Sequence, residues 1–333
     1  IQPNQIRVND NVEFVLAGNV TNPNMPVTTG AYQTTMSGTS DIYVARFSDD
    51  GSALLASTYI GGSGLESLMI GATTNYTALG AATNAINPAD ITFDNNGDIW
   101  VTSNSASTNF PVTANAYQAT NAGGNDVVLF KMSADLTTLV YSTYFGGNAW
   151  DGGIGLEYNE KDNTVGVVGY TASTTFPTTA GVFKTTKPGG IDGFAILLSN
   201  TNYQLVASTY LGTTGDDIAM RLAFDCAGNY YVAGRTNGNY PLTSTQGHVP
   251  NGFVFLDKLN PGLSTSLAST RTGAAITSIV PSSMMVDICG NILVATITSS
   301  SLQQNMPLTA DAFETSPRAF YFAAFQPNFT DLL

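Results

Sequence analysis

The stretch ASTYLGT at residues 207–213 decides the fold, because versions of it recur along the chain. They read ASTYIGG at 56–62, YSTYFGG at 141–147 and, in a more divergent copy, ASTRTGA at 268–274. Self-similarity at a fixed period indicates a fold built from stacked copies of one supersecondary unit. The sequence therefore predicts a repeat protein.

Three further blocks accompany this one in a constant order. One is an aromatic residue or Met followed by Pro, and an apolar strand begins about fifteen residues after it. Another is a turn rich in Asp, Asn and Gly, as in DNNGDIWVTS at 94–103 and DCAGNYYVAGRT at 225–236. The X-Pro pairs are Met25-Pro26, Phe110-Pro111, Phe176-Pro177, Tyr240-Pro241 and Met306-Pro307, and the strands after them begin at Asp41, Asp126, Asp192, Gly252 and Ala319.

One period of about 65 residues holds four short strands, joined by tight turns and by one longer loop that carries the X-Pro pair. A single sheet of this size cannot bury its own face, but several sheets packed around an axis can. The sequence therefore predicts an all-β protein, a β-propeller of five four-stranded blades that form a closed ring or part of a larger one. We expect residues 1–333 to form one domain, with an insertion at about 68–86.

The composition excludes some classes of partner. The formal net charge is −13, with only 11 basic residues, which opposes binding to nucleic acid or to anionic membrane surfaces.

The longest uncharged stretch is rich in Thr and Asn and could not cross a bilayer. The chain begins without Met or a signal-like segment, so we expect a processed chain or an excised part. The low charge and the abundance of Thr, Asn and Gly are typical of an exported protein.

The series STY-x-G-G, D-x-x-G-N-x-Y-V-x-G and an opening strand such as DIYVARF resembles the SBBP family of bacterial β-propeller repeats. The resemblance covers nearly the whole chain. It implies a secreted or surface-exposed bacterial protein, and it transfers no catalytic residues, because the family is a class of fold and repeat. The family name suggests seven blades, whereas this chain has five copies, the last of which ends before another STY block.

The X-Pro aromatics Phe110, Phe176 and Tyr240 are the first candidate site. They lie on loops that a propeller gathers on one face, and loops held by a rigid scaffold often carry binding residues. They could therefore form a face for a ligand or partner. Alternatively, they fill the gaps between blades, and their recurrence in every repeat favours this packing role.

A carboxylate recurs seven residues after the Tyr of STY, at Glu66, Asp151 and Asp217, where the divergent copy has Ser278. This position precedes the inner strand, near the mouth of the channel. Several such groups could converge on a metal ion, calcium above all, because hard cations prefer many oxygen ligands. Alternatively, each carboxylate caps its own turn. The loops at 94–98 and 48–52 faintly resemble calcium loops, but they lack the regular ligand spacing and coincide with hairpin turns.

Signals for catalysis are weak. The single histidine, His248, occupies the position at which other repeats have Tyr32, Tyr117, Phe183 and Phe313. We therefore interpret it as a replacement for an aromatic packing residue and not as a catalytic base. There is no set of zinc ligands, no G-x-S-x-G motif and no P-loop. Cys226 and Cys289 occupy equivalent turns and are either a disulfide or two free buried thiols. We therefore predict no enzyme, no catalytic residues and no cofactor apart from possible calcium.

The sequence favours a non-catalytic module of an extracellular or cell-surface protein that acts as a binding, adhesion or structural scaffold. Its partner would be a protein or a glycan at the loop face. One alternative is a carbohydrate-active enzyme that uses carboxylates at the channel mouth, since such chemistry needs two carboxyl groups in different roles. Another is a component of a secretion or surface complex. The oligomeric state is left open.

Overall fold

The computed structural model describes residues 2–66, 89–243, 249, 251–273, 279–298, 308–310, 312–313, 319–329 and 331–333. These residues form antiparallel strands almost throughout, and the helical element among them is the short 3-10 turn η2 (Pro327–Phe329). In this part of the chain no helix is long and apolar enough to span a membrane. The strands form five sheets in chain order.

Each of the first four sheets has four strands, paired in the order in which they occur. The first sheet contains β1 (Gln2–Val8), β2 (Phe14–Val20), β3 (Asp41–Phe47) and β4 (Leu54–Ile60). The second contains β5 (Ala89–Phe93), β6 (Ile99–Ser105), β7 (Asp126–Met132) and β8 (Leu139–Phe145). The third contains β9 (Asp151–Asn159), β10 (Thr164–Thr171), β11 (Asp192–Ser199) and β12 (Leu205–Leu211). The fourth contains β13 (Asp217–Phe224), β14 (Tyr230–Thr236), β15 (Val254–Leu259) and β16 (Ser266–Thr272).

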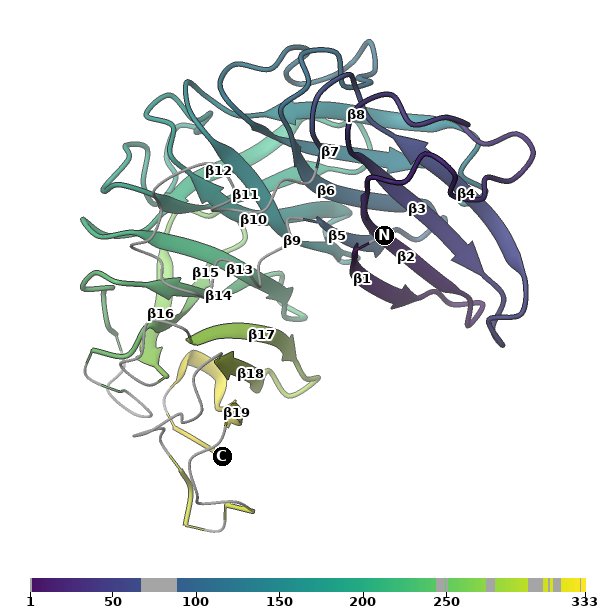
Figure 1. The fold of residues 1–333 in the computed structure, drawn as a ribbon. Helices are drawn as coiled ribbons and strands as arrows, with labels where there is room; N and C mark the ends of the chain where they lie inside the picture. The colour runs from purple at the N-terminus through teal and green to yellow at the C-terminus, as the bar shows by residue number, and fades with distance from the viewer. Residues whose placement is uncertain are drawn as a thin grey trace.

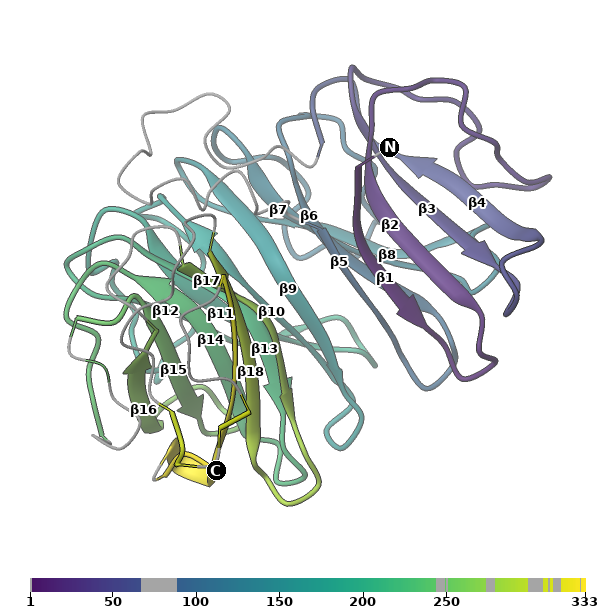
Figure 2. The same ribbon diagram turned by 60° about the horizontal axis from the view of Figure 1, so that its bottom comes forward.

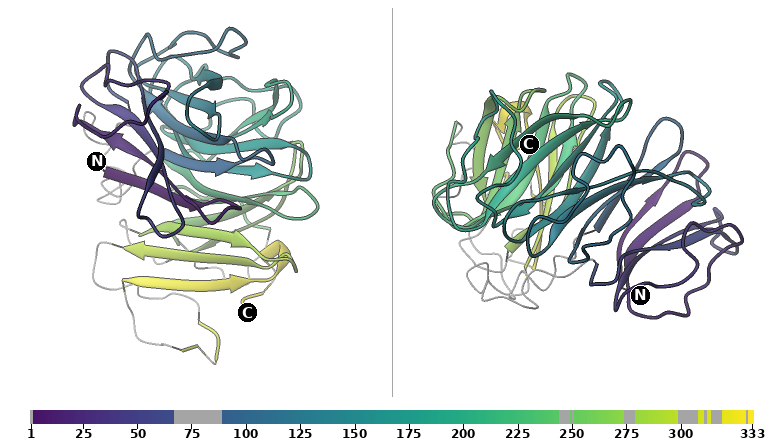
Figure 3. Two further views of the ribbon diagram at one scale, coloured as in Figure 1. Left: turned by 90° about the vertical axis from the view of Figure 1, so that its right-hand side faces the viewer. Right: turned by 90° about the horizontal axis from the view of Figure 1, so that it is seen from above.

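The fifth sheet has three strands among the described residues: β17 (Ile279–Val286), β18 (Ile292–Thr298) and β19 (Phe320–Phe325). Figure 1 shows the five sheets arranged as blades around an arc, with the N-terminal sheet at one end and the three-stranded sheet at the other. Figures 2 and 3 show the same succession of blades from other sides. The predicted all-β fold with propeller blades is confirmed, but the described sheets form an open arc and not a closed ring. Within the described residues the fifth blade has no counterpart of the strand that an STY block supplies in the other blades.

The third strand of each blade begins at its predicted residue or within two residues of it. β3, β7 and β11 begin at Asp41, Asp126 and Asp192, as the repeat predicts. β15 begins at Val254 and not at Gly252, because the Gly252 N–H donates to the Val249 carbonyl at 2.8 Å and so closes a turn. β19 begins at Phe320, one residue after Ala319. The insertion predicted at 68–86 lies outside the described residues.

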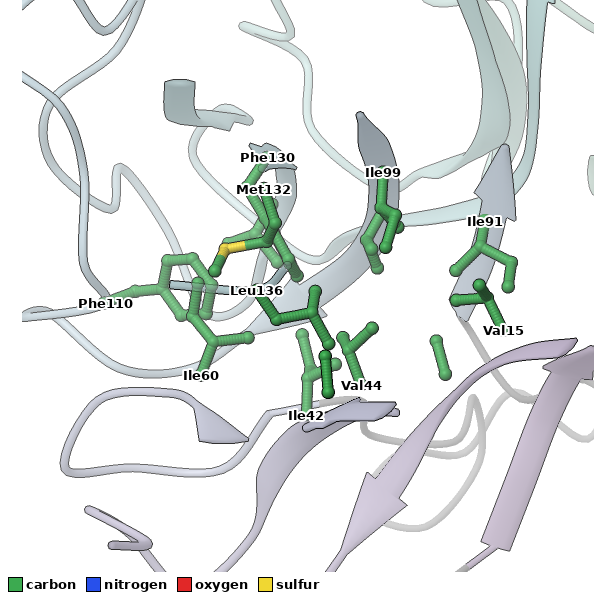
Figure 4. Packing of buried hydrophobic residues seen from close by; sticks show 14 of the residues in the cluster. Val15, Ile42, Val44, Ile60, Ile91, Ile99, Phe110, Phe130, Met132 and Leu136 are labelled. Atoms are coloured by element: carbon green, nitrogen blue, oxygen red, sulfur yellow. The ribbon is translucent and has the colours of Figure 1, made fainter. Parts of the chain in front are cut away.

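The core consists of separate layers between successive sheets. In the first layer Val15, Ile42 and Val44 from the first sheet meet Ile91 and Phe130 from the second. Figure 4 shows these side chains pointing toward one another across the gap between the two sheets. Similar layers lie between the second and third, third and fourth, and fourth and fifth sheets. Burial between blades therefore supplies the hydrophobic stabilisation that no single sheet could provide.

The X-Pro loop of one blade forms a hydrogen bond to the next blade, at the turn between the third and fourth strands of that next blade. The Tyr32 N–H donates to the Leu136 carbonyl at 3.1 Å, and the Phe183 N–H donates to the Leu263 carbonyl at 2.8 Å. Both leucines are buried with left-handed backbone, φ 59° and 52°, which is costly for a residue with a side chain. The first blade has the exposed Gly51 at the corresponding position, φ 72°, with no neighbour around it. A leucine thus occupies this left-handed position where the preceding blade buries its side chain, and glycine occupies it where the side chain would be exposed.

Candidate functional site: the X-Pro loops and the inner strands

The STY block holds the X-Pro loop of its own blade through its serine. The hydroxyl of each serine donates to the carbonyl of the loop proline. The pairs are Ser57 to Pro26 at 2.9 Å, Ser142 to Pro111 at 2.6 Å, Ser208 to Pro177 at 2.6 Å and Ser269 to Pro241 at 2.8 Å. The serine and the proline recur together because they form one hydrogen bond in each of the four blades.

The threonine and tyrosine of the block fix two more points of the loop. The Thr143 hydroxyl accepts the Gln118 N–H at 2.9 Å, and Thr58 and Thr209 do the same for Gln33 and Lys184. The Tyr144 hydroxyl accepts the Phe110 N–H at 2.9 Å and donates to the Ser107 carbonyl at 2.6 Å. In the first three blades the loop is therefore tied to the outer strand at several points, which limits the conformations it can adopt.

The three X-Pro aromatics predicted as a candidate ligand face are buried, each only 2–3% exposed. Phe110 packs between the first and second sheets, Phe176 between the second and third, and Tyr240 between the third and fourth. The Tyr240 hydroxyl donates to the buried Asp257 carboxylate at 2.7 Å. Their rings pack between blades and offer no exposed surface for a partner.

The exposed aromatic rings of the loops lie seven residues further along. Tyr32 is 38% exposed and Tyr117 is 44% exposed, at equivalent places in the first two blades. Tyr117 stacks on Phe145 with ring centroids 4.6 Å apart and an interplanar angle of 12°, so one face of its ring is covered. The sequence showed that Tyr32 and Tyr117 occupy a recurring aromatic position, but it did not identify them as exposed, because recurrence alone does not tell whether a Tyr is buried.

The recurring carboxylates cap the turns that precede the inner strands. The Asp151 Oδ2 accepts the Gly147 N–H and the Ser173 hydroxyl, both at 2.8 Å. The Asp217 Oδ2 accepts the Thr213 N–H at 2.6 Å. Glu66 accepts hydroxyl hydrogen bonds from Ser105 at 2.9 Å and from Ser107. All three carboxylates are fully buried.

The structure keeps these carboxylates in separate blades. Within the described residues no group of three or more His, Cys, Asp or Glu side chains is placed to hold a metal ion. Ser278 lies outside those residues. Burial raises the pKa of Glu66 and Asp151 and raises that of Asp217 to about 6. Their observed bonding is that of turn caps, and calcium binding by them stays an untested prediction.

Two other features noted in the sequence have clear structural roles. The loop at 94–98 is the hairpin turn between β5 and β6, and its Asp94 and Asp98 carboxylates bind the Lys131 ammonium at 2.6 and 3.0 Å. A side chain of the protein therefore supplies the cation at this loop. Cys226 and Cys289 are both free and exposed, whereas we expected either a disulfide or buried thiols. His248 lies outside the described residues.

The inner strands carry a group of charged side chains that sequence reasoning missed. Arg7 of β1 places its Nη2 3.7 Å from the Asp90 Oδ1 of β5 and 3.2 Å from the Glu157 Oε2 of β9. Arg221 of β13 donates from Nε to the Ser282 carbonyl of β17 at 2.9 Å. This inner-strand cluster thus takes charged side chains from the first four blades and a backbone carbonyl from the fifth, and it does not repeat from blade to blade.

The inner-strand cluster contains two carboxylates, Asp90 and Glu157, and two guanidinium groups, Arg7 and Arg221, which oppose the effects of burial on one another's pKa. Burial raises the pKa of Asp90 and of Glu157, while the Arg7 guanidinium acts in the opposite direction on both. Burial lowers the pKa of Arg221, which Asp90 partly offsets. The side chains of Arg7 and Glu157 are 33% and 30% exposed, so solvent reaches the cluster. The available sequence signal was a charged residue within the inner strands of the first four blades: Arg7, Asp90, Glu157 and Arg221.

Two solved structures resemble the chain in fold. One is a luciferin-regenerating enzyme, at 9% identity and a TM-score of 0.39, covering 99% of this chain and 95% of that chain. The other is an acylaminoacyl peptidase of Pyrococcus horikoshii, at 6% identity and a TM-score of 0.41, covering 97% of this chain and 44% of that chain. Likeness at this level transfers neither activity to this protein.

The prediction that the protein is no enzyme is corrected: both similar structures are enzymes by name, so the fold gives no ground for excluding an activity. The reasoning behind that prediction was also incomplete. It assumed that every carboxylate near the channel recurs at one repeat position, whereas Asp90 and Glu157 lie on inner strands and occur once. The prediction is withdrawn.

Comparison with curated protein sequences gave no match. A family model described as a beta-propeller repeat matches residues 208–241, which run from the serine of the third STY block to the proline of the fourth X-Pro pair. The matched stretch contains β13 and β14. Residues 208–241 of this chain are therefore a beta-propeller repeat of the SBBP family.

Proposed function

We propose that this protein is a recognition module of an extracellular or cell-surface protein and that it binds a glycan or protein partner on the face of its X-Pro loops. The observation that carries the proposal is the placement of Tyr32 and Tyr117. Their rings are partly exposed, occupy equivalent sites and stand on loops that the STY block holds in place. Loops positioned by a rigid scaffold are typical binding elements.

A glycan is the partner that these rings favour. Tyr117 has one ring face covered by Phe145, which leaves the other face available for stacking. Aromatic side chains contribute large contact areas at low entropic cost, because they have only two rotatable bonds. The net charge of −13 favours neutral or cationic partners over polyanions.

The test is a glycan array probed with the wild-type protein and with a Tyr32→Ala/Tyr117→Ala double variant. The matched control is Leu55→Ala/Val206→Ala, which removes two exposed apolar side chains from outer strands. We expect the tyrosine variant to lose at least about tenfold in affinity for the best glycan, and the control to retain it. Equal binding by all three proteins would contradict a role for these rings, and binding only to a protein partner would replace the glycan.

The inner-strand cluster favours a second candidate function, cleavage of a glycan. Both carboxylates approach the same nitrogen of Arg7, so their oxygens lie at most about 7 Å apart, which allows the separation of about 5–5.5 Å that retaining glycosidases use. Glu157→Gln should then abolish turnover of a glycan that the protein cleaves, while circular dichroism reports an intact fold. Absence of turnover by the wild-type protein on every glycan it binds would remove this candidate.

A further inference from the structure

Arg235 of β14 is a buried cation without a hydrogen-bond partner. The residue is 1% exposed, and its Nε, Nη1 and Nη2 atoms find no acceptor in the part of the chain that the structure describes. The Phe253 ring lies 5.2 Å from its Cζ and covers one side of the guanidinium. A guanidinium carries five donors and stays charged, so burying it without acceptors is costly.

No acidic side chain forms an ion pair with Arg235 among the described residues. Burial lowers the pKa of Arg235 to about 10, and Asp216 is the carboxylate that acts against this shift. The Asp216 Oδ1 already accepts the Ile191 N–H at 3.0 Å, and no ion pair joins Asp216 to Arg235 among the described residues. Arg235 therefore remains protonated at neutral pH and lacks a bonded anion.

Two hydroxyl groups share the face of the sheet on which Arg235 lies. Arg235 pairs with Val254, and Val254 pairs with Thr272 on the outer strand. Residues directly opposite one another on antiparallel strands have their side chains on one face. Thr270, two residues before Thr272, has the same orientation. The Oγ1 atoms of both threonines are buried without a hydrogen-bond partner.

The combination of Arg235 with a hydroxyl at position 272 is specific to the fourth blade, whereas Thr270 is the threonine of the STY block and recurs in the first three blades. The same register in the first three blades joins Asn19, Asn104 and Tyr170 to Ile60, Phe145 and Leu211, so the outer-strand position is apolar in all of them. The asparagines also have acceptors: Asn19 donates to the Glu66 carbonyl at 2.7 Å and Asn104 to the Tyr170 hydroxyl at 3.4 Å. A structural requirement of the repeat would recur in each blade, and the pair of Arg235 and Thr272 does not.

We propose that Arg235, together with Thr270 and Thr272, binds a carboxylate group of a small ligand on the face of the fourth blade that is turned toward the fifth. The guanidinium fork matches a carboxylate in a bidentate manner, and the two hydroxyls can donate to the same oxygens. One cation matches one monoanion, whereas a multiply charged phosphate would add charge to a protein at −13. The ligand is a simple organic acid or a sugar acid, and the site is independent of the loop-face tyrosines.

Thermal unfolding of the full chain tests the site. Acetate and glucuronate serve as probes, with glucose as the neutral control and sodium chloride at matched ionic strength. Because a ligand that binds only the folded state stabilises it, we expect the carboxylates to raise the midpoint by about 2 °C or more at saturation. A larger shift with glucuronate at equal concentration identifies a sugar acid, and an equal shift identifies a simple carboxylate.

Variants locate the effect. Arg235→Leu should remove the shift, and Thr272→Val, a milder change, should weaken the apparent affinity about tenfold. Arg46→Leu is the matched control, since Arg46 already has the Ala134 carbonyl at 2.8 Å and the Glu13 carboxylate at 3.6 Å, and it should keep the full shift. If Arg235→Leu does not fold, Thr272→Val decides. No shift with either carboxylate in the wild-type protein, or an unchanged shift in Thr272→Val and Arg235→Leu, would overturn the proposal.

Discussion

Replacing Phe176 with Ala removes a ring that packs between the second and third blades. Phe176 is 3% exposed, its ring centroid lies 4.7 Å from that of Phe194, and a second contact to Tyr210 spans 6.1 Å. Deleting a buried phenylalanine costs about 3–5 kcal/mol, because transfer free energy is lost and a cavity remains. Loss of the aromatic pair accounts for about 0.5–1.5 kcal/mol of this.

Equilibrium unfolding in urea, followed by both tryptophan fluorescence and far-UV circular dichroism, measures this loss. Two probes are needed because a repeat array can unfold blade by blade, and coincident transitions justify a single free energy. Phe176→Leu is the control, since it keeps apolar volume and should cost less than about 1.5 kcal/mol. A cost below about 1 kcal/mol for Phe176→Ala, or loss of partner binding at full stability, would refute the packing role.

Three further changes probe other contacts. Tyr144→Phe removes the hydroxyl that bonds Phe110 N–H and the Ser107 carbonyl, and should cost about 1–3 kcal/mol in urea unfolding, with an unchanged midpoint as the contrary result. Burial, aided by the Asp151 carboxylate, raises the pKa of Asp126 to about 7, above its unfolded value of about 3.9, so the folded state binds more protons. Stability from this group is therefore present below about pH 4 and is lost as pH rises toward 7, and Asp126→Asn should flatten that part of a stability–pH curve. Lys131→Met leaves two carboxylates unpaired at a buried turn and should cost about 3–5 kcal/mol, which an added Asp94→Asn change should partly restore in the same assay.

Much of the architecture could be predicted because each repeated residue serves one repeated contact. The serine of STY predicts the X-Pro loop because it bonds the proline carbonyl in all four complete blades. The first glycine after STY recurs for a related reason: a side chain at Gly146 would collide with the Asp126 carboxylate. Periodicity reports such contacts well, since they depend on residues within one blade or its neighbour.

Contacts made once are not visible as a pattern. Arg7, Asp90 and Glu157 are far apart in the sequence, and only the arrangement of inner strands around the arc brings them together. Arg235 stands where the first three blades have Asn or Tyr, and Thr272 stands where they have apolar residues. Both were therefore visible as deviations from the repeat, but their burial was not. The exposure of Tyr117 likewise depends on how far the neighbouring blade covers its loop. These features need the packing of blades, which the pattern of one repeat does not determine.

The central claim is that the STY residues hold the X-Pro loops rigid, so that the loops can present a binding face. Amide hydrogen exchange measures this directly, because an N–H in a stable hydrogen bond exchanges only when the bond opens. The Phe110 and Gln118 N–H groups bond to the side chains of Tyr144 and Thr143, and both should exchange as slowly as amides in β7. If instead they exchange as fast as the amides of the exposed turn around Gly51, the loops are not held by the outer strand and the account is contradicted.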